Sequence, residues 1–505
     1  MTDSIALTES LKVLWDRTAG SADARFWGVL NRFTADAIKG PFTVGLRYDV
    51  DAAFEKDKTW AKERPRKFTF EYAQRNVDLI LGDHYASFGR GIVLNVVKND
   101  EFGLDTTIQG EKLSVDTDYV SFRGLAGSVN PGDPIRFTPA QVKAPDPALS
   151  DRDLLWGGEA VLSWPGVVSA GARYVGAVIR TDLTTEPAEY EQDNSQNNFG
   201  VSLEFPNLFG VGAFYAEYAW LELEDRKKGG LQDVRQEGRA AYFSASFYGH
   251  GVDFLLEGKD YYRATFVYAE GPSLEYQKVV FELPHYEDEL GLHGRIGYRI
   301  PVADLYVHLD YLDAKTHKTL PKDLAGHYDE GKKYGWITGV RHLYGGFERD
   351  FANSARIEAT AGYRGEATDR WIHAEFFASA PILPQHSVAA TVMWRQYQGL
   401  AIYEGTTYGS QLFSVTYAWS PLLTVTGTYE HSNEPFAGST GDSVVSGGGG
   451  KRENFPAVEV TVRPMETLAV TAFWGATKGG LQCSGGICRQ VPAFDGLRVE
   501  VAAQF

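Results

Sequence analysis

From about residue 155 to the end of the chain, segments of roughly ten residues alternate apolar side chains with polar or small ones. A β-strand gives this period of two when its two faces meet different surroundings. In the segment 292–300, the even positions are apolar or glycine, whereas the odd positions include His293, Arg295 and Arg299. Strands of soluble sandwiches are commonly about five or six residues long, so segments of this length favour strands that cross a bilayer.

The connections between these segments also alternate in length. Longer stretches, such as 180–197, 313–333 and 431–455, separate eight short ones. The short connections are expected at Trp164-Pro165, Phe205-Pro206, Ile300-Pro301, Ala380-Pro381, Ser420-Pro421 and Arg463-Pro464, and at the tight turns 249–252 and 344–347. Short turns at one end and long loops at the other are typical of an up-and-down transmembrane barrel, with the short turns periplasmic and the long loops extracellular.

These connections predict a strand number. Eight hairpins and the last segment give about seventeen strands after residue 155, and bacterial barrels of this kind carry even numbers. The N-terminal part offers strands at 26–34, 42–50, 68–72, 77–81 and 113–125. We therefore predict an all-β, antiparallel barrel formed by one domain, 1–505, with about 22 strands in a range of about 18 to 24.

Composition supports this class and excludes others. The chain has 29 Phe, 27 Tyr and 54 Gly but 3 Met, which favours strands and turns over helices. The net charge of -17 argues against a nucleic-acid partner, because phosphate neutralisation needs a basic surface. No window reaches the roughly 18 apolar residues of a transmembrane helix.

The chain starts Met1-Thr2-Asp3-Ser4, without the basic and apolar regions of a signal peptide. The chain is therefore either cytosolic or a mature form with an initiator Met. We expect that a signal peptide has been removed and that the protein lies in the bacterial outer membrane. Its expected partners there are membrane lipid, lipopolysaccharide and the barrel assembly machinery.

Two residues, Pro301 and Val302, are expected to join strands 292–300 and 304–311. Pairing about that turn would place Arg299 opposite Asp304, Arg295 opposite His308 and His293 opposite Asp310. The predicted lumen-lining residues are His293, Arg295, Arg299, Asp304, His308, Asp310, Arg356, Glu358, His373, Glu375 and Arg395. Lumen faces of large barrels are routinely polar, so a wall role with some effect on selectivity is favoured over catalysis.

The end of the chain carries two features. Leu497, Val499, Val501 and Phe505 lie on one face of an alternating final segment, which resembles the C-terminal β-signal of outer-membrane barrels. Just before it, Cys483 and Cys488 are the two cysteines of the chain, and we expect them to form a disulfide in an extracellular loop, with two free thiols as the alternative.

No nucleophile elbow, zinc-protease, phosphate-loop or haem-attachment motif is present. His285 and His293 flank the carboxylates 287–289, but loop carboxylates near histidine are more often simply solvated. We therefore expect no enzyme activity, no cofactor and no metal.

Two segments do not alternate like strands. Segment 82–110 is rich in glycine, and segment 126–152 contains five prolines, too many missing donors for a central strand. Each is expected to be a loop or to fold into the lumen.

Within the first segment, Gly82, Asp83, Tyr85, Phe88, Gly89 and Gly91 form the pattern G-D-x-Y-x-x-F-G-x-G, and Gly103 and Asp105 follow. This pattern resembles that of a family of uncharacterised outer-membrane barrel proteins. In that family a later L-G-x-D element follows, which is here reduced to Gly103 and Asp105. The resemblance implies an outer-membrane barrel and assigns no substrate.

Three functions remain. The leading one is a porin-like channel for passive passage of small solutes, with a weak preference for cations. The second is a sheath that holds a periplasmic partner, such as an electron carrier, in its lumen. The third is a barrel hydrolase with its site at the extracellular rim, or a soluble all-β carbohydrate-active protein that uses paired carboxylates such as Glu204 and Glu217. In the membrane versions, Phe214, Ala216, Tyr218 and Trp220 should face lipid rather than a second sheet.

Overall fold

The computed structural model describes most of the chain. The described residues are 4–16, 26–55, 58–98, 105–130, 152–179, 193–226, 234–262, 264, 268, 271–272, 274, 289–316, 339–366, 369–399, 405–433, 453–478, 480–484, 487–491 and 494–505. Within them lies no helix long and apolar enough to cross a membrane.

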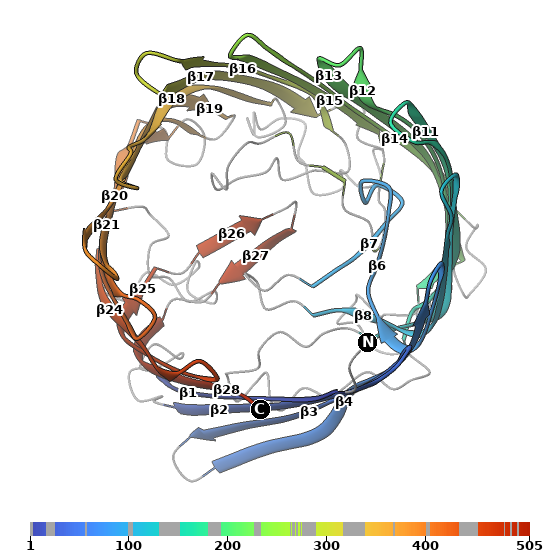
Figure 1. Ribbon diagram of the computed structural model, residues 1–505, viewed down its shortest axis with the longest axis horizontal. Helices are drawn as coiled ribbons and strands as arrows, with labels where there is room; N and C mark the ends of the chain where they lie inside the picture. Colours follow the sequence, from blue (N-terminus) through green and yellow to red (C-terminus); the bar gives the residue numbers. More distant parts are fainter. Residues whose placement is uncertain are drawn as a thin grey trace.

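In this part of the chain, 24 strands form one sheet that closes on itself as a ring (Figure 1). Every wall strand runs antiparallel to its neighbours, and β1 pairs with β28 to close the ring. The first wall strands are β1 (Ser4–Asp16), β2 (Phe26–Lys39), β3 (Phe42–Glu55), β4 (Lys58–Gln74), β5 (Val77–His84), β8 (Thr107–Asp116) and β9 (Val120–Asn130). The next are β10 (Leu154–Trp164), β11 (Val168–Ile179), β12 (Asp193–Leu208), β13 (Gly212–Arg226), β14 (Val234–Gly249), β15 (Val252–Tyr262), β16 (Glu289–Ile300) and β17 (Leu305–Thr316). The last are β18 (Val340–Asp350), β19 (Arg356–Gly365), β20 (Asp369–Leu383), β21 (His386–Gly399), β22 (Thr407–Trp419), β23 (Leu423–Ser432), β24 (Asn454–Met465), β25 (Leu468–Thr477) and β28 (Phe494–Gln504).

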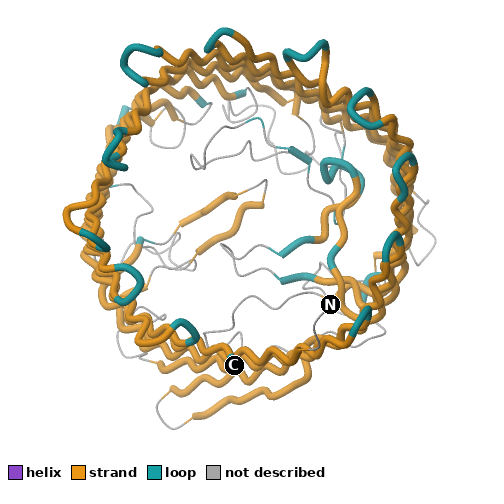
Figure 2. Tube along the Cα trace, viewed as in Figure 1, coloured by secondary structure: helices purple, strands orange, loops and turns teal. Residues whose placement is uncertain are grey.

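Two short hairpins leave the wall. One consists of β6 (Ala86–Phe88) and β7 (Leu94–Val96), and the other of β26 (Gly480–Ser484) and β27 (Ile487–Val491). In the tube view down the barrel, both hairpins appear within the outline of the ring (Figure 2).

The predicted fold class is confirmed, and the strand number of 24 lies within the predicted range of about 18 to 24, two above the estimate of about 22. Seventeen wall strands follow residue 153, as predicted. The two additional strands are N-terminal: β1 was missed, and the segment expected as one strand at 113–125 is two strands, β8 and β9, joined by a turn at 117–119.

The register of the β16–β17 hairpin differs from the prediction. Arg295 lies opposite Asp310, Arg299 opposite Tyr306, and His293 opposite Leu312. A two-residue hairpin turn needs a positive φ at its first position, which proline cannot adopt. The connection therefore takes four residues, 301–304, and places the positive φ of 46° at Asp304.

The tight turn predicted at 344–347 is also wrong, because these residues lie inside β18. Its two glycines serve close packing in the wall instead. A Cβ atom on Gly346 would come within 2.8 Å of Nε2 of His308, so glycine leaves room for that ring. The real turn, at 351–355, has a positive φ at Ser354.

The alternation along each strand sorts side chains to the two faces of the wall. On β12 and β13, Phe199, Val201 and Trp220 are 47%, 43% and 48% exposed, whereas inward neighbours such as Asn198 and Glu217 are buried. Comparable exposed apolar side chains occur on most of the other strands around the ring. Such a continuous apolar exterior is far larger than the few hundred Å² that a soluble monomer exposes.

A row of glycines crosses three wall strands where the chain turns into the barrel. Gly82 on β5 lies opposite Gly110 on β8, which lies opposite Gly127 on β9. A Cβ atom on Gly110 would overlap the carbonyl oxygen of Ala126. Glycine is therefore required for the close approach of these backbones.

We expect Gly110→Ala to destabilise the barrel by about 2 kcal/mol or more, because a wall backbone must shift to admit the methyl group. Urea unfolding of the refolded protein in detergent measures the change. Gly427→Ala is the matched control, since a Cβ there meets no atom within 4 Å. Equal effects of the two substitutions would contradict the close-approach argument.

Candidate functional site: the lumen wall and its inner segment

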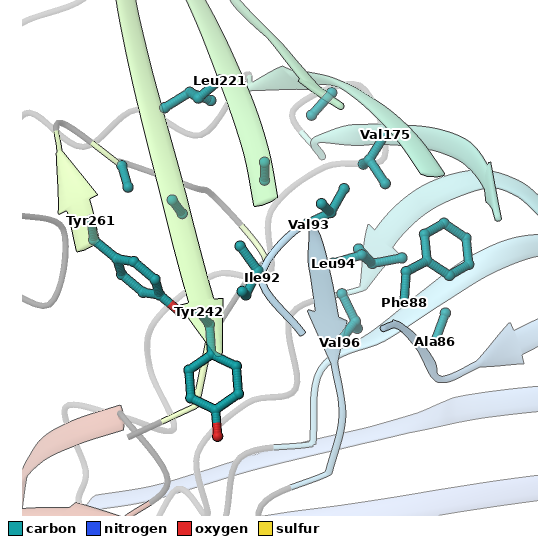
Figure 3. Packing of buried hydrophobic residues seen from close by; sticks show 14 of the residues in the cluster. Ala86, Phe88, Ile92, Val93, Leu94, Val96, Val175, Leu221, Tyr242 and Tyr261 are labelled. Atoms are coloured by element: carbon teal, nitrogen blue, oxygen red, sulfur yellow. The ribbon is translucent and has the colours of Figure 1, made fainter. Parts of the chain in front are cut away.

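Residues 86–96, here called the inner segment, fold against the inner face of the wall (Figure 1). Phe88, Ile92, Val93 and Leu94 are at most 1% exposed and pack in one apolar cluster with inward side chains of the wall (Figure 3). Their wall partners include Ile108, Leu125, Val129, Leu155, Val175, Tyr215, Leu221, Tyr242 and Tyr261. The cluster gives the barrel an apolar core on one side of its lumen.

Carboxylates of the wall hold the turn of the inner segment. The amide of Gly89 donates to Glu159 Oε1 at 2.9 Å, and the amide of Arg90 donates to Glu217 Oε2 at 3.0 Å. Arg173 lies between the two carboxylates, 3.1 Å from Glu159 and in contact with Glu217. All three charged side chains are nearly inaccessible, so removing Arg173 would leave two buried carboxylates without its positive charge.

This geometry explains several positions of the glycine-rich pattern. Gly89, with a φ of 56°, lies against the ion network, and a Cβ there would overlap the guanidinium of Arg173. Gly91, with a φ of 88°, completes the turn. Asp83 accepts from the amide of Phe68 at 3.0 Å and from the hydroxyl of Thr107 at 2.8 Å, which joins β5 to its neighbours.

A second polar cluster anchors the chain where it returns to the wall. Asp105 accepts hydrogen bonds from Lys67 at 2.5 Å, from Tyr85 and from Arg47. Burial by itself would raise the pKa of the Asp105 carboxyl, but these hydrogen bonds and the positive charges of Lys67 and Arg47 outweigh it. The pKa is lowered to about 2.

The residues predicted to line the lumen on β16 and β17 point inward and meet one another. His293 lies 3.1 Å from Glu257 and 3.3 Å from Asp310, and His308 lies 2.6 Å from the other oxygen of Asp310. Arg295 is 4.0 Å from Asp310. The contact between His293 and Asp310 is diagonal, within the reach of long side chains on neighbouring strands.

The other predicted lumen residues lie elsewhere. Arg299 and Asp304 form an exposed pair at 2.9 Å beside a short turn, and Arg356 lies 2.6 Å from Glu348 and 3.2 Å from Glu358. The inward face of β20 carries His373 and Glu375, and Arg395 lies opposite His373 on β21.

Several important inward residues were missed. Glu159 and Arg173 were not singled out, and Glu217 was considered only as a hydrolase carboxylate, whereas it is buried in the ion network. His342 was also missed, although its Nε2 lies 2.8 Å from Nε2 of His373. The signal was available, because each occupies a polar position of an alternating strand. Which of these polar side chains meet depends on the register of neighbouring strands. The alternation within one strand does not determine that register.

The opposite side of the wall is lined by hydroxyl groups. Thr416 and Thr426 lie 3.0 Å apart, as do Thr461 and Thr471, on the inward faces of β22 to β25. These side chains are partly exposed. Among the described residues, the lumen therefore has one packed side and one polar, accessible side.

The remaining candidates lie on β26 to β28. Cys483 lies directly opposite Cys488 in the backbone pairing of β26 and β27, and their disulfide remains a prediction. Val499 and Val501 of β28 pair with Val13 and Leu11 of β1, and Phe505 is 72% exposed at the short-turn end.

His285 and residues 131–151 of the proline-rich segment lie outside the described residues, while 126–130 belong to β9. The described residues contain no group of three or more side chains placed to hold a metal ion.

The sequence matches a family of unknown function, DUF6029, over residues 22–284 and 442–505. The chain belongs to this family. The matched ranges contain the inner segment, the ion network around Arg173, the polar cluster around Asp105, and β28. The wall from β16 to β23 lies outside them. The sequence matches no curated protein.

Solved structures share the barrel architecture at low sequence identity. The siderophore receptor PirA from Pseudomonas aeruginosa has a TM-score of 0.51 and 8% identity over 100% of this chain and 80% of its own. The translocation pore of the P pilus usher PapC has a TM-score of 0.46 and 9% identity over 99% of both chains. OccK5 (OpdH) from Pseudomonas aeruginosa has a TM-score of 0.39 and 11% identity over 72% of this chain and 93% of its own.

We expect Gly89→Ala to release the inner segment, because the added methyl group meets the guanidinium of Arg173. Hydrogen exchange of residues 86–96 should accelerate by at least about tenfold, which corresponds to local destabilisation of about 1.4 kcal/mol. Gly210→Ala is the matched control, since Gly210 has a similar positive φ of 74° but open space around it. Unchanged exchange in Gly89→Ala would refute the proposed fit.

We expect Asp105→Asn to destabilise the protein by about 2 kcal/mol at pH 7, because the lowered pKa of Asp105 stabilises the fold wherever the carboxyl is ionised. This stabilisation is complete above the unfolded pKa of 3.8 and is lost as the pH falls through about 2. The two proteins should therefore converge in urea unfolding near pH 2. Asp118→Asn, in an exposed turn, should change stability little at either pH, and a constant gap for Asp105→Asn would contradict the assignment.

Proposed function

We propose that this protein is a porin-like channel of the bacterial outer membrane through which small solutes diffuse. The apolar exterior carries the membrane part of the proposal, because no water-soluble surface of that extent would remain monomeric. The siderophore receptor likeness supports the fold alone. The short-turn end, where β1 begins and β28 ends, is assigned to the periplasm, and the long-loop end to the cell exterior.

The hydroxyl-lined wall carries the channel part. Thr416, Thr426, Thr461 and Thr471 offer donors and acceptors to water and polar solutes without a fixed charge. The inner segment packs over the opposite side and narrows the lumen there. We therefore assign the solute path to the side of β21 to β25, and the net charge of -17 favours cations weakly.

The environment and partners follow from this location. The exterior would meet membrane lipid and lipopolysaccharide, and β28 with its terminal Phe505 would be the segment that the barrel assembly machinery recognises. Glu217 does not favour the hydrolase alternative, because it is buried and engaged by Arg173 and the Arg90 amide.

Single-channel recording in planar bilayers tests the channel. Thr426→Cys, in a Cys483→Ser/Cys488→Ser background, should lose a measurable part of its current when a charged, water-soluble thiol reagent is added, because the reagent attaches inside the path. Val425→Cys, its outward-facing neighbour, should not respond. The reversal potential in a salt gradient should indicate a cation preference.

The other outcomes are equally informative. A protein that stays soluble and monomeric without detergent would overturn the membrane assignment. A protein that inserts without conducting would overturn the channel and favour the sheath around a periplasmic partner.

A further inference from the structure

The inner face of the wall contains a polar depression of about 300 Å³ where β24, β25, β28, β1 and β2 lie side by side (Figure 1). Its lining includes Gln504, at the end of β28, and the turn residues Glu466 and Thr467, so it lies at the short-turn end. Under the proposed function, on which this inference rests, that end is the periplasmic mouth. The hydroxyl-lined wall leads to it, because the lining residue Arg463 follows Thr461 on the same face of β24.

One cross-strand row places small side chains between two arginines. Arg32 on β2 lies opposite Ser10, Ser10 opposite Ala502, and Ala502 opposite Ala469 on β25. Arg463 on β24 lies at the other end of this row. The arginines are four strand spacings apart, about 19 Å along the wall, so they flank the small residues and leave an open floor between them.

A β-bulge places Arg463 beside this floor. Between Val462 and Met465 the register of β24 against β25 shifts, which leaves Arg463 and Pro464 opposite Ala469. Proline has no amide hydrogen to donate to the ladder, and within sheets it is found at such bulges.

Both arginines retain hydrogen-bonding groups for a ligand. Within the described part of the chain, the Arg463 side chain makes no hydrogen bond or ion pair. Arg32 makes an ion pair from Nε to Asp49 at 3.4 Å, and Asp49 is held more closely by Arg47, at 2.6 Å. The terminal nitrogens of Arg32 and the guanidinium of Arg463 can therefore donate to an oxyanion.

Two of the nearby carboxylates do not oppose an anion in the depression. Glu9 occupies an outward position of β1 and accepts a hydrogen bond from Asn31 at 3.2 Å. Glu500 lies 2.9 Å from Lys12 in the next row of the inner face.

Two other carboxylates limit the charge of the ligand. Glu466 lines the depression at its short-turn edge, and Asp36 follows Thr34 on the inner face of β2. A second negative charge at the far end of a ligand would meet these carboxylates, whereas a single carboxylate between the arginines would not.

Uncharged polar groups lie between the arginine row and that edge. Thr34 lies opposite Thr8, and Thr8 lies opposite Gln504. The backbone amide of Gln504 donates to the carbonyl of Thr467 at 2.8 Å, which brings Thr467 beside this row. Hydroxyl and amide side chains both donate and accept, so they suit a ligand that carries hydroxyl groups.

We propose that the depression binds a small, hydroxyl-bearing monocarboxylate, with the carboxylate between Arg32 and Arg463. A guanidinium can donate two parallel hydrogen bonds to a carboxylate, which favours this anion over a spherical one. A volume of about 300 Å³ is at the small end of the range for ligand pockets. Such a site would retain one class of solute at the mouth of a lumen that otherwise prefers cations weakly.

The test uses the full chain refolded in detergent micelles, with equilibrium dialysis against labelled gluconate at pH 7. Gluconate is the probe because it has a single carboxylate on a hydroxylated chain. We expect saturable binding, with glucose competing at least about tenfold less well because it lacks the carboxylate. Glucarate, which has a second carboxylate, should also compete less well than unlabelled gluconate.

Arg463→Gln should weaken gluconate binding by about tenfold, through loss of charge-assisted hydrogen bonds. Its fold should be unaffected, because this side chain has no partner among the described residues. Ala502→Leu should weaken binding as well, by filling the floor. Arg498→Gln is the matched control, because Arg498 is an inward arginine of β28 that lies 3.6 Å from Glu459 and does not line the depression.

Equal binding by Arg463→Gln and the unchanged protein would overturn the site. Tighter binding of glucarate or inorganic phosphate than of gluconate would overturn the ligand class. Gluconate binding by a barrel that inserts without conducting would defeat the channel and leave this site standing, whereas normal conductance without gluconate binding would defeat this inference alone.

Discussion

The pairing of β1 with β28 is the contact on which the rest of the structure depends. Nine residues of β1, from Thr8 to Asp16, lie opposite residues 496–504, and Leu7 exchanges two backbone hydrogen bonds with Phe505. Without this seam, both strands would be edge strands that present rows of unpaired amides and carbonyls. Closure also places Lys12 2.9 Å from Glu500 across the seam on the lumen side.

A barrel of 24 strands encloses more space than its own wall side chains can fill. The chain fills part of it with the inner segment, which brings its own apolar side chains and needs partners for its turn amides. Glu159 and Glu217 accept from those amides, and the positive charge of Arg173 lies between the two carboxylates. Apolar packing and the buried ion network therefore stabilise the same turn, and the family match includes both.

The lumen is consequently unequal around its circumference. One side is packed and ionic, while β22 to β25 present hydroxyl groups that remain partly exposed. The outer face is uneven as well, since Ala241 and Gly258 leave a depression among larger side chains. Both asymmetries come from the choice of side chain at individual positions. The alternation of the strands, and with it the backbone pairing of the wall, continues through them.

Much of the wall was determined by the sequence alone. Alternation gave the faces of β12, β16 and β20, because side chains of a strand must point alternately to the outer face and to the lumen. The spacing of short connections gave seventeen strands after residue 155. Two N-terminal strands were missed. In β1, Leu7, Leu11 and Val13 share a face on which Glu9 is the one polar residue, so its alternation was available. The turn between β8 and β9 interrupts no apolar run. Tertiary structure decided the register at Arg295 and Asp310, the glycine pair inside β18 and the meeting of Arg90 with Glu217, 127 residues apart. These depend on which strands close against one another, and no local pattern encodes contacts over such separations.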